Sequence, residues 1–168
     1  MIPKKSVLDR GRQSRRSAAP SDRPRLVFAR DDTAGREKRL EVPVRILVVE
    51  DDFLVAMQME SALTEAGFEV AGIASSGEDA VELALGERPR LAVMDIRLAG
   101  DRDGIDTAVQ LFSQQGIRCI FATAHHDEHA RRRAAAAAPL GWLHKPYTME
   151  SLVGLVRYAL EELDKAGH

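Results

Sequence analysis

The chain has 168 residues, of which 45% are hydrophobic, enough for one folded domain with a substantial core. No apolar run approaches the roughly 18 residues that span a bilayer, and no apolar segment of the secretory kind opens the chain, so neither a membrane span nor a signal peptide is expected. The single cysteine, Cys119, lies in an apolar run and is expected to be buried and reduced, which favours a cytoplasmic protein.

The formal net charge of −2 is the sum of two segments of opposite sign. Residues 1–42 hold 12 Lys and Arg against 6 Asp and Glu, whereas residues 43–168 hold 12 against 20. The first segment has little apolar periodicity and cannot bury enough surface to offset its ordering entropy, so we expect a basic, flexible, disordered N-terminal tail. Its basic pairs indicate either contact with nucleic acid or an acidic partner, or a solvated arm, which we favour because no aromatic pattern accompanies the charge.

From Pro43 onward, short apolar runs alternate with helical patterns, which predicts βα units and a parallel sheet. Continuous apolar runs such as Ile46 to Val49 are typical of strands covered on both faces. We therefore expect one α/β domain over residues 43–168, a doubly wound five-stranded parallel sheet. The expected strands are about 44–49, 68–74, 91–95, 118–123 and 141–144, and the expected helices lie near 53–66, 77–86, 104–115, 127–138 and 148–163.

Local signals mark the helix ends and faces. Gly67 lies where a helix C-cap is expected, and Pro89 and Pro139 each help to end the helix before them. The run Arg131 to Arg133 followed by five alanines is a strong helix former, and its arginines indicate either a partner contact or a solvated face. The last helix has an apolar stripe at three- and four-residue spacing, made of Leu152, Leu155, Val156, Ala159, Leu160 and Leu163.

Charged and hydroxyl side chains stand at the ends of the expected strands. Glu50 and Asp51 follow the first strand, Asp95 ends the third, Thr123 ends the fourth and Lys145 follows the fifth. In a parallel sheet these ends meet at one edge, so we expect the side chains to converge there. Clustered carboxylates stay ionised only beside a cation, and Mg²⁺ suits oxygen-only sites.

An ammonium at this edge would neutralise Asp95 before a reaction and hold a phosphate oxygen afterwards, while Thr123 could donate its hydroxyl to the phosphate. The pattern therefore predicts a magnesium site with phosphoryl chemistry on Asp95. The alternative is that Asp51, Asp52 and Asp95 only cap helices or loops, which is common for each of them taken singly.

Together these residues resemble the receiver domain of bacterial two-component response regulators. The matching residues are the acid pair Glu50-Asp51, Asp95 within VMDIRL, Thr123 within FATAH, and Lys145-Pro146. The spacings agree as well, since 44 residues separate Asp51 from Asp95 and 22 separate Thr123 from Lys145. The resemblance covers about Val44 to Leu163 and implies a flavodoxin-like (βα)5 fold.

The resemblance further implies that Asp95 accepts a phosphoryl group from a histidine kinase. Asp51 and Asp95 would bind Mg²⁺ directly together with the backbone carbonyl of Arg97, and Glu50 would act through water. Thr123 and Lys145 would contact the phosphate. The aromatic switch position of the family corresponds to Trp142, for which a simple packed ring is the alternative.

The Asp95–Gly104 loop lacks the proline common in the family and is one residue longer than usual. The DIRL loop and FAT followed by Ala-His most resemble receivers paired with HWE-family histidine kinases. We expect a stand-alone, non-enzymatic phospho-switch or phosphorelay intermediate. Its expected partners are a histidine kinase or phosphotransfer protein and a downstream protein, with a homodimer left open and no membrane or nucleic-acid partner.

Two other functions are alternatives for this chain. One is a magnesium-dependent phosphatase that forms an aspartyl phosphate, which typically needs an acid two residues after the nucleophile, where this chain has Arg97. The other is a receiver-like binding module that phosphorylation does not regulate.

Residues 1–42 are expected to be dispensable for folding and for phosphate uptake, because the receiver pattern is complete without them. A shortened chain starting at Pro43 should keep its melting temperature within about 2 °C of the full chain. It should also take up phosphate at a similar rate. A loss of several degrees would show that the tail packs as an integral element, most plausibly through Leu26, Val27 and Phe28.

Overall fold

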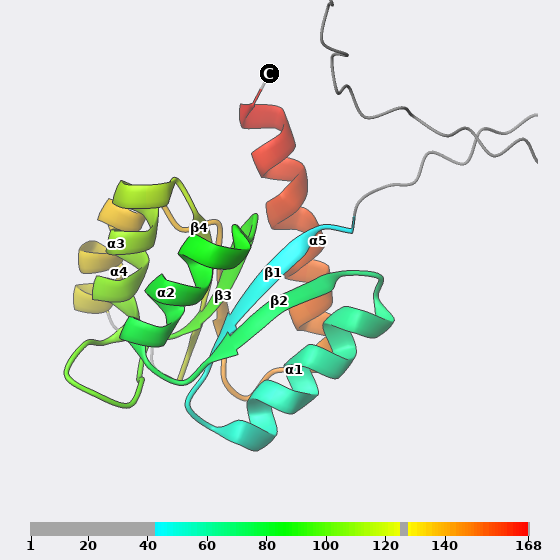
Figure 1. Cartoon of the computed structure of the whole chain (residues 1–168), viewed down its shortest axis with the longest axis horizontal. Coiled ribbons are helices and arrows are strands. Elements are labelled where there is room, and N and C mark those ends of the chain that lie inside the picture. Colours follow the sequence, from blue (N-terminus) through cyan, green and yellow to red (C-terminus); the bar gives the residue numbers. More distant parts are fainter. Residues whose placement is uncertain (1–42, 125–127, 168) are drawn as a thin grey trace, which may run out of the picture. The chain divides into compact units, whose positions relative to one another are not determined.

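The computed structural model describes residues 43–124 and 128–167, and the account below concerns these residues. Their centre is a sheet of five strands in the spatial order β2-β1-β3-β4-β5, with every neighbouring pair parallel (Figure 1). The expected doubly wound parallel sheet is confirmed, and each strand lies within one residue of its expected bounds. The strands are β1 Arg45–Val49, β2 Glu69–Ala74, β3 Leu91–Asp95, β4 Arg118–Thr123 and β5 Gly141–His144.

Helices cover both faces of the sheet. α1 and α5 lie on one face, and α2, α3 and α4 lie on the other (Figure 1). No helix among the described residues is both long and apolar enough to cross a membrane. The helices are α1 Phe53–Glu65, α2 Gly77–Glu87, α3 Gly104–Gln115, α4 Glu128–Ala134 and α5 Met149–Ala166.

The sheet divides the apolar core into two parts because successive strand residues point to opposite faces. In β1, Ile46 and Val48 pack on the α1–α5 side, whereas Leu47 and Val49 pack on the other side. Burial on both faces explains why the strands read as continuous apolar runs. Cys119 belongs to the α2–α3 side, where burial raises the pKa of its thiol to about 12.

The helix-end signals of the sequence are reflected in the structure. Asp52, Ser76, Asp103 and Thr148 are the N-caps of α1, α2, α3 and α5, and each side chain accepts a hydrogen bond from a first-turn N–H. The α1 helix ends one residue earlier than expected, and Gly67 follows its C-cap with φ +91°. The stripe on α5 faces the core as expected: Leu152, Val156, Ala159 and Leu160 are buried, and Leu155 and Leu163 pack against them.

The fourth helix is shorter than the 127–138 expected from its alanine run, and residue 127 lies outside the described residues. The α-helix ends at Ala134 and a 3₁₀ turn follows over Ala135–Ala137. In a 3₁₀ turn, residues three apart lie on one face, which here buries both Ala134 and Ala137. Ala138 then takes a left-handed conformation before Pro139, so core packing, rather than the helix propensity of alanine, sets where this segment ends.

The start of α3 packs unusually closely against the end of β3. The backbone N–H of Gly104 donates to the carbonyl of Ile96 at 2.9 Å. A Cβ at position 104 would lie 1.9 Å from the backbone carbonyl oxygen of Asp95, which is far inside van der Waals contact. Only glycine fits here without a backbone shift.

We therefore expect Gly104→Ala to lower the free energy of unfolding by about 3 kcal/mol, because the backbone must move to admit the methyl group. Gly154→Ala is the matched control, since position 154 is exposed within α5 and a Cβ there meets nothing within 4 Å. It should raise the free energy of unfolding by about 1 kcal/mol through helix propensity. Urea denaturation of both variants would measure this, and equal effects would contradict the close packing at Gly104.

Candidate functional site

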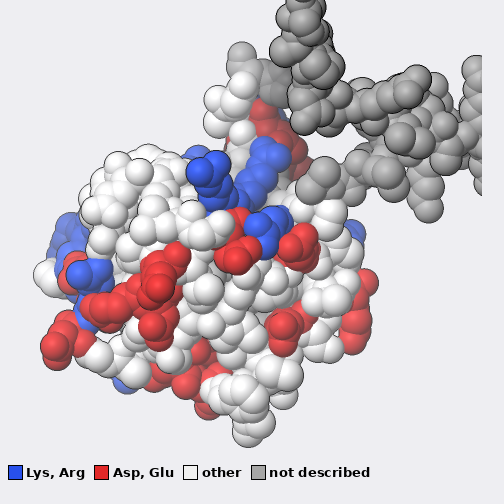
Figure 2. Space-filling view, viewed as in Figure 1, with Lys and Arg blue, Asp and Glu red and all other residues white. Residues whose placement is uncertain are grey.

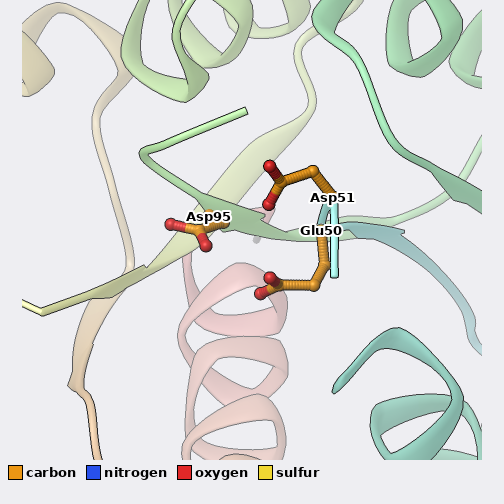
Figure 3. Close-up of side chains that lie close together, drawn as sticks. All are labelled: Glu50, Asp51 and Asp95. Carbon is orange, nitrogen blue, oxygen red and sulfur yellow. The ribbon is translucent and has the colours of Figure 1, made fainter. Parts of the chain in front are cut away.

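Three carboxylates meet at the carboxyl edge of the sheet. Glu50 and Asp51 follow β1, Asp95 ends β3, and these two strands are hydrogen-bonded neighbours. One oxygen from each residue lies within 4.8 Å of the others, and Figure 3 shows the three side chains gathered around a common space. Glu50 is 2% exposed and Asp95 7% exposed, whereas Asp51 is exposed. The cluster is therefore buried on one side and open to solvent on the other.

Lys145 joins this cluster from the end of β5. Its ammonium donates to Oδ2 of Asp95 at 2.6 Å and to Oε2 of Glu50 at 3.0 Å. The backbone N–H of Lys145 donates to the carbonyl of Thr123 at 2.8 Å, which continues the pairing of β5 with β4 beyond the last strand residue. One positive charge thus lies among three acidic groups, so the cluster remains net negative.

The pKa values show how these charges balance. Burial raises the pKa of Glu50 and the neighbouring Asp95 charge adds to this, although the hydrogen bond from Lys145 opposes them. Burial lowers the pKa of Lys145, but its hydrogen bonds to Asp95 and Glu50 outweigh this effect and the pKa is raised overall. Lys145 therefore stays charged. A second cation would further reduce the repulsion among the three carboxylates.

The carboxylate of Asp95 is held at both oxygens. Oδ2 accepts from Lys145, and Oδ1 accepts from the backbone N–H of Arg97 at 3.0 Å. This second bond holds the backbone of Arg97 next to the Asp95 side chain. The three carboxylates and the exposed side at Asp51 fit a hard divalent cation such as Mg²⁺, which binds oxygen ligands and keeps several waters.

The capping alternative holds for Asp52 and, in part, for Asp95, one oxygen of which accepts from the loop N–H of Arg97 while the other accepts from Lys145. Oδ1 of Asp52 accepts from the backbone N–H groups of Leu54 and Val55, so this side chain caps α1. Glu50 instead points into the cluster, where its Oε1 accepts from the backbone N–H of Asp52 at 3.4 Å.

Thr123 lies at the same edge as the acids. Its neighbour Ala122 pairs with Asp95 in the β3–β4 register, so Thr123 stands one residue beyond the level of Asp95, and it is 7% exposed. The sheet thus brings Glu50, Asp51, Asp95, Thr123 and Lys145 to one edge, as the sequence predicts. The roles assigned to them, and to the carbonyl of Arg97, stay predictions.

Trp142 lies apart from the acids, within β5, and packs toward α4. Its ring is 4.9 Å from the ring of Phe121, between centroids, and the Arg131 guanidinium lies 4.9 Å from its centroid on α4. The packed-ring interpretation of Trp142 therefore describes its contacts in this structure. A switch role for the same ring is a separate prediction.

The arginines of α4 have contacts that the sequence did not reveal. Arg131 stacks on Trp142, and Arg133 forms ion pairs with Asp103 and Asp106 of the α3 region. Among the residues that the structure describes, Arg132 pairs within its own helix, with Glu128 at 3.4 Å, and is exposed. The contacts of Arg131 and Arg133 join residues that lie 11 to 30 positions apart, so no local signal in the sequence points to them.

Comparison with known proteins agrees with this geometry. The family model of the response regulator receiver domain matches residues 46–157. The transcriptional regulatory protein PdtaR of Mycobacterium tuberculosis is 34% identical over 119 residues, which are 71% of this chain and 58% of PdtaR. The phyllosphere-induced regulator PhyR of Methylorubrum extorquens is 31% identical over 130 residues, 77% of this chain and 48% of PhyR.

A solved receiver structure has a similar overall fold. The signal receiver domain of a modulated diguanylate cyclase from Desulfovibrio desulfuricans has a TM-score of 0.67 and 33% identity to this chain, covering 72% of this chain and 96% of that domain. The chain spans only about half to three-fifths of the length of the two curated relatives. Because the family model matches well over half of the residues, the chain belongs to the response regulator receiver domain family.

Proposed function

We propose that this receiver domain accepts a phosphoryl group on Asp95 and acts as a phospho-switch or phosphorelay intermediate through contacts with other proteins. The observation that carries the proposal is the Asp95 carboxylate itself, hydrogen-bonded to Lys145 at 2.6 Å beside two further carboxylates at one edge of the sheet. The Lys145 ammonium already lies beside the Asp95 carboxylate, so it is in place to bind a phosphoryl group that is added to this carboxylate.

In the proposed reaction a carboxylate oxygen of Asp95 attacks phosphorus and forms an O–P bond. The P–N bond to the donor histidine breaks, and its electron pair leaves with the imidazole nitrogen. Lys145 moves its hydrogen bond from the Asp95 carboxylate to a phosphoryl oxygen, and the Thr123 hydroxyl donates to another. Both groups would then be drawn toward Asp95.

Glu50, Asp51 and Asp95, with the backbone carbonyl of Arg97, are the residues that would hold Mg²⁺. When bound, the ion would neutralise the negative charge of the transferring group beside the acidic cluster. The chain contributes the orientation of Asp95, fixed by Lys145 on one oxygen and by the backbone N–H of Arg97 on the other.

Receiver domains are generally signalling modules rather than enzymes, and we propose that this one catalyses only its own phosphorylation and dephosphorylation. The residue two positions after Asp95 is Arg97, which cannot protonate a leaving group as the acid of an aspartyl-phosphate phosphatase does. The complete set of acids, lysine and threonine argues against a binding module that phosphorylation leaves unregulated.

The phosphodonor is proposed to be a histidine kinase or phosphotransfer protein that contacts α1. Phe53 and Leu54 at the start of α1 are each 71% exposed, and they follow the acid pair directly. Figure 2 shows acidic side chains spread over the face in view and an uncharged area where α1 begins. Four further points stay predictions from the sequence. They are pairing with an HWE-family kinase, a downstream protein partner, a homodimer and a cytoplasmic location.

Asp95 should be the only phosphorylated residue, and only in the presence of a divalent cation, because an anionic donor cannot approach three carboxylates without one. Incubation with Mg²⁺ and a small acyl phosphate, followed by intact-mass measurement, should show one added phosphoryl group. Asp95→Asn should abolish it, and removal of Mg²⁺ with a chelator should do the same. Asp52→Asn is the control, since asparagine also caps helices and Asp52 lies outside the cluster. Undiminished labelling of Asp95→Asn would refute the assignment.

The emission of Trp142 should change when the site is loaded, because Thr123 and Lys145 would move toward the new negative charge, and Lys145 directly follows β5, the strand that contains Trp142. Beryllium fluoride with Mg²⁺ serves as a mimic of the bound phosphoryl group. Trp142 is the only tryptophan, so the fluorescence signal has a single source. Asp95→Asn should remove the change. Confirmed binding without any spectral change would mean that Trp142 takes no part in the switch.

A further inference from the structure

We propose that Arg133, on α4, is a positioning residue for phosphoryl acceptance: it holds the loop between Asp95 and α3 (residues 96–103) in the conformation that orients Asp95 and Arg97. This inference rests on the proposed function, because it concerns the same site. The contact links the loop after β3 to α4, the helix that follows β4. The loop and α4 would therefore move together.

The first step is the contact between Arg133 and the start of α3. Its Nη1 lies 2.8 Å from Oδ2 of Asp103, and its Nη2 lies 2.9 Å from Oδ1 of Asp106. A planar guanidinium can serve two carboxylates at once, which a lysine ammonium does with less fixed geometry. The hydrogen bonds to Asp103 and Asp106 raise the pKa of Arg133.

The second step leads from Asp103 into the loop. Asp103 is the N-cap of α3, and its Oδ1 accepts from the backbone N–H of Asp106 at 2.9 Å while Oδ2 faces Arg133. Burial raises the pKa of Asp103, but the hydrogen bonds from Arg133 and from backbone N–H groups outweigh this and the pKa is lowered. The Asp103 side chain is thus fixed at both oxygens, once by its own helix and once by α4.

The third step leads from Asp103 to the phosphoacceptor. The next residue, Gly104, donates its N–H to the carbonyl of Ile96 and lies against the backbone carbonyl of Asp95. Arg97 in turn donates its N–H to Oδ1 of Asp95. Displacement of Asp103 would therefore reach Asp95 and Arg97, two of the four residues that are proposed to hold the metal.

The rest of the loop is held by contacts with its own side of the sheet. Ile96 and Leu98 pack on the core, Ala99 forms a bridge with Ser76, and Arg102 contacts Glu78 at 3.7 Å and bonds to Gln110. The pair of Arg133 with Asp103 links the far end of the loop to α4. Because both side chains of this pair are about one-third exposed, it contributes little to global stability, and its effect is expected to be local.

The test compares Arg133→Met with Arg132→Met in the full chain. Both variants remove one arginine from α4 and add the same side chain, but within the described part of the chain Arg132 pairs with Glu128 of its own helix and not with the loop or α3. Hydrogen exchange of the Arg97 and Gly104 amides, in metal-free protein, reports on the loop directly. Calorimetric titration with Mg²⁺ reports on the site, and the labelling rate with a small acyl phosphate is measured at saturating Mg²⁺.

Arg133→Met should speed exchange of the Arg97 and Gly104 amides and weaken Mg²⁺ binding by about 10-fold, the lower end of the effect of losing an outer-shell partner of a metal site. The labelling rate at saturating Mg²⁺ should change much less, because the bound ion itself then holds the loop. Arg132→Met should match the unaltered chain in amide exchange, Mg²⁺ affinity and labelling rate. Arg133→Lys keeps the charge and should give the same changes with smaller magnitude. It replaces Arg133→Met if that variant does not fold.

Equal exchange and equal Mg²⁺ affinity in the Arg133 and Arg132 variants would overturn the role of Arg133. A chain that takes up no phosphoryl group at all would instead defeat the proposed function. In that case the exchange measurement still decides the role of Arg133 in holding the loop, because it requires neither metal nor phosphodonor.

Discussion

The repulsion among Glu50, Asp51 and Asp95 is the constraint on which the rest of the site depends. Three carboxylates within 4.8 Å are costly in a partly buried setting, and the single ammonium of Lys145 offsets only part of that cost. The remaining negative charge favours binding of a divalent cation. The bound cation would in turn reduce the repulsion of an anionic phosphoryl group. The order of strands produces this crowding, because β1 and β3 are neighbours and both end at the same edge.

The fold keeps the crowded groups in place by burying the strands on both faces. In a strand, a shift of one residue would turn every side chain to the opposite face. Both faces of β1 are packed here, by Ile46 and Val48 on one side and by Leu47 and Val49 on the other. This packing fixes the register of β1 and therefore the position of Glu50 at the edge of the sheet. The close approach of Gly104 to the carbonyl of Asp95 fixes the path of the chain after β3 in the same way.

Much of this arrangement could be predicted from the sequence because its signals are local. Apolar runs mark the strands, and polar residues that follow them mark the carboxyl edge, so the convergence of Glu50, Asp51, Asp95, Thr123 and Lys145 was predictable from topology. The end of α4 was not, because the burial of Ala137 overrides the helix propensity of its alanines. The contacts of Arg133 were not predictable either, because a run of three arginines does not reveal which of them faces the rest of the domain.

The division of the core by the sheet has an evolutionary consequence. Side chains of α1 and α5 pack in one half, and those of α2, α3 and the turn after α4 pack in the other, so substitutions in the two halves share few contacts and their effects on stability should be nearly additive. After gene duplication, one copy can therefore change the helix face that a donor would meet without disturbing the packing around Trp142. Under the proposed function, the contact with a donor on α1 could then diverge separately from a contact near Trp142, while the acids and the lysine at the edge of the sheet stay as they are.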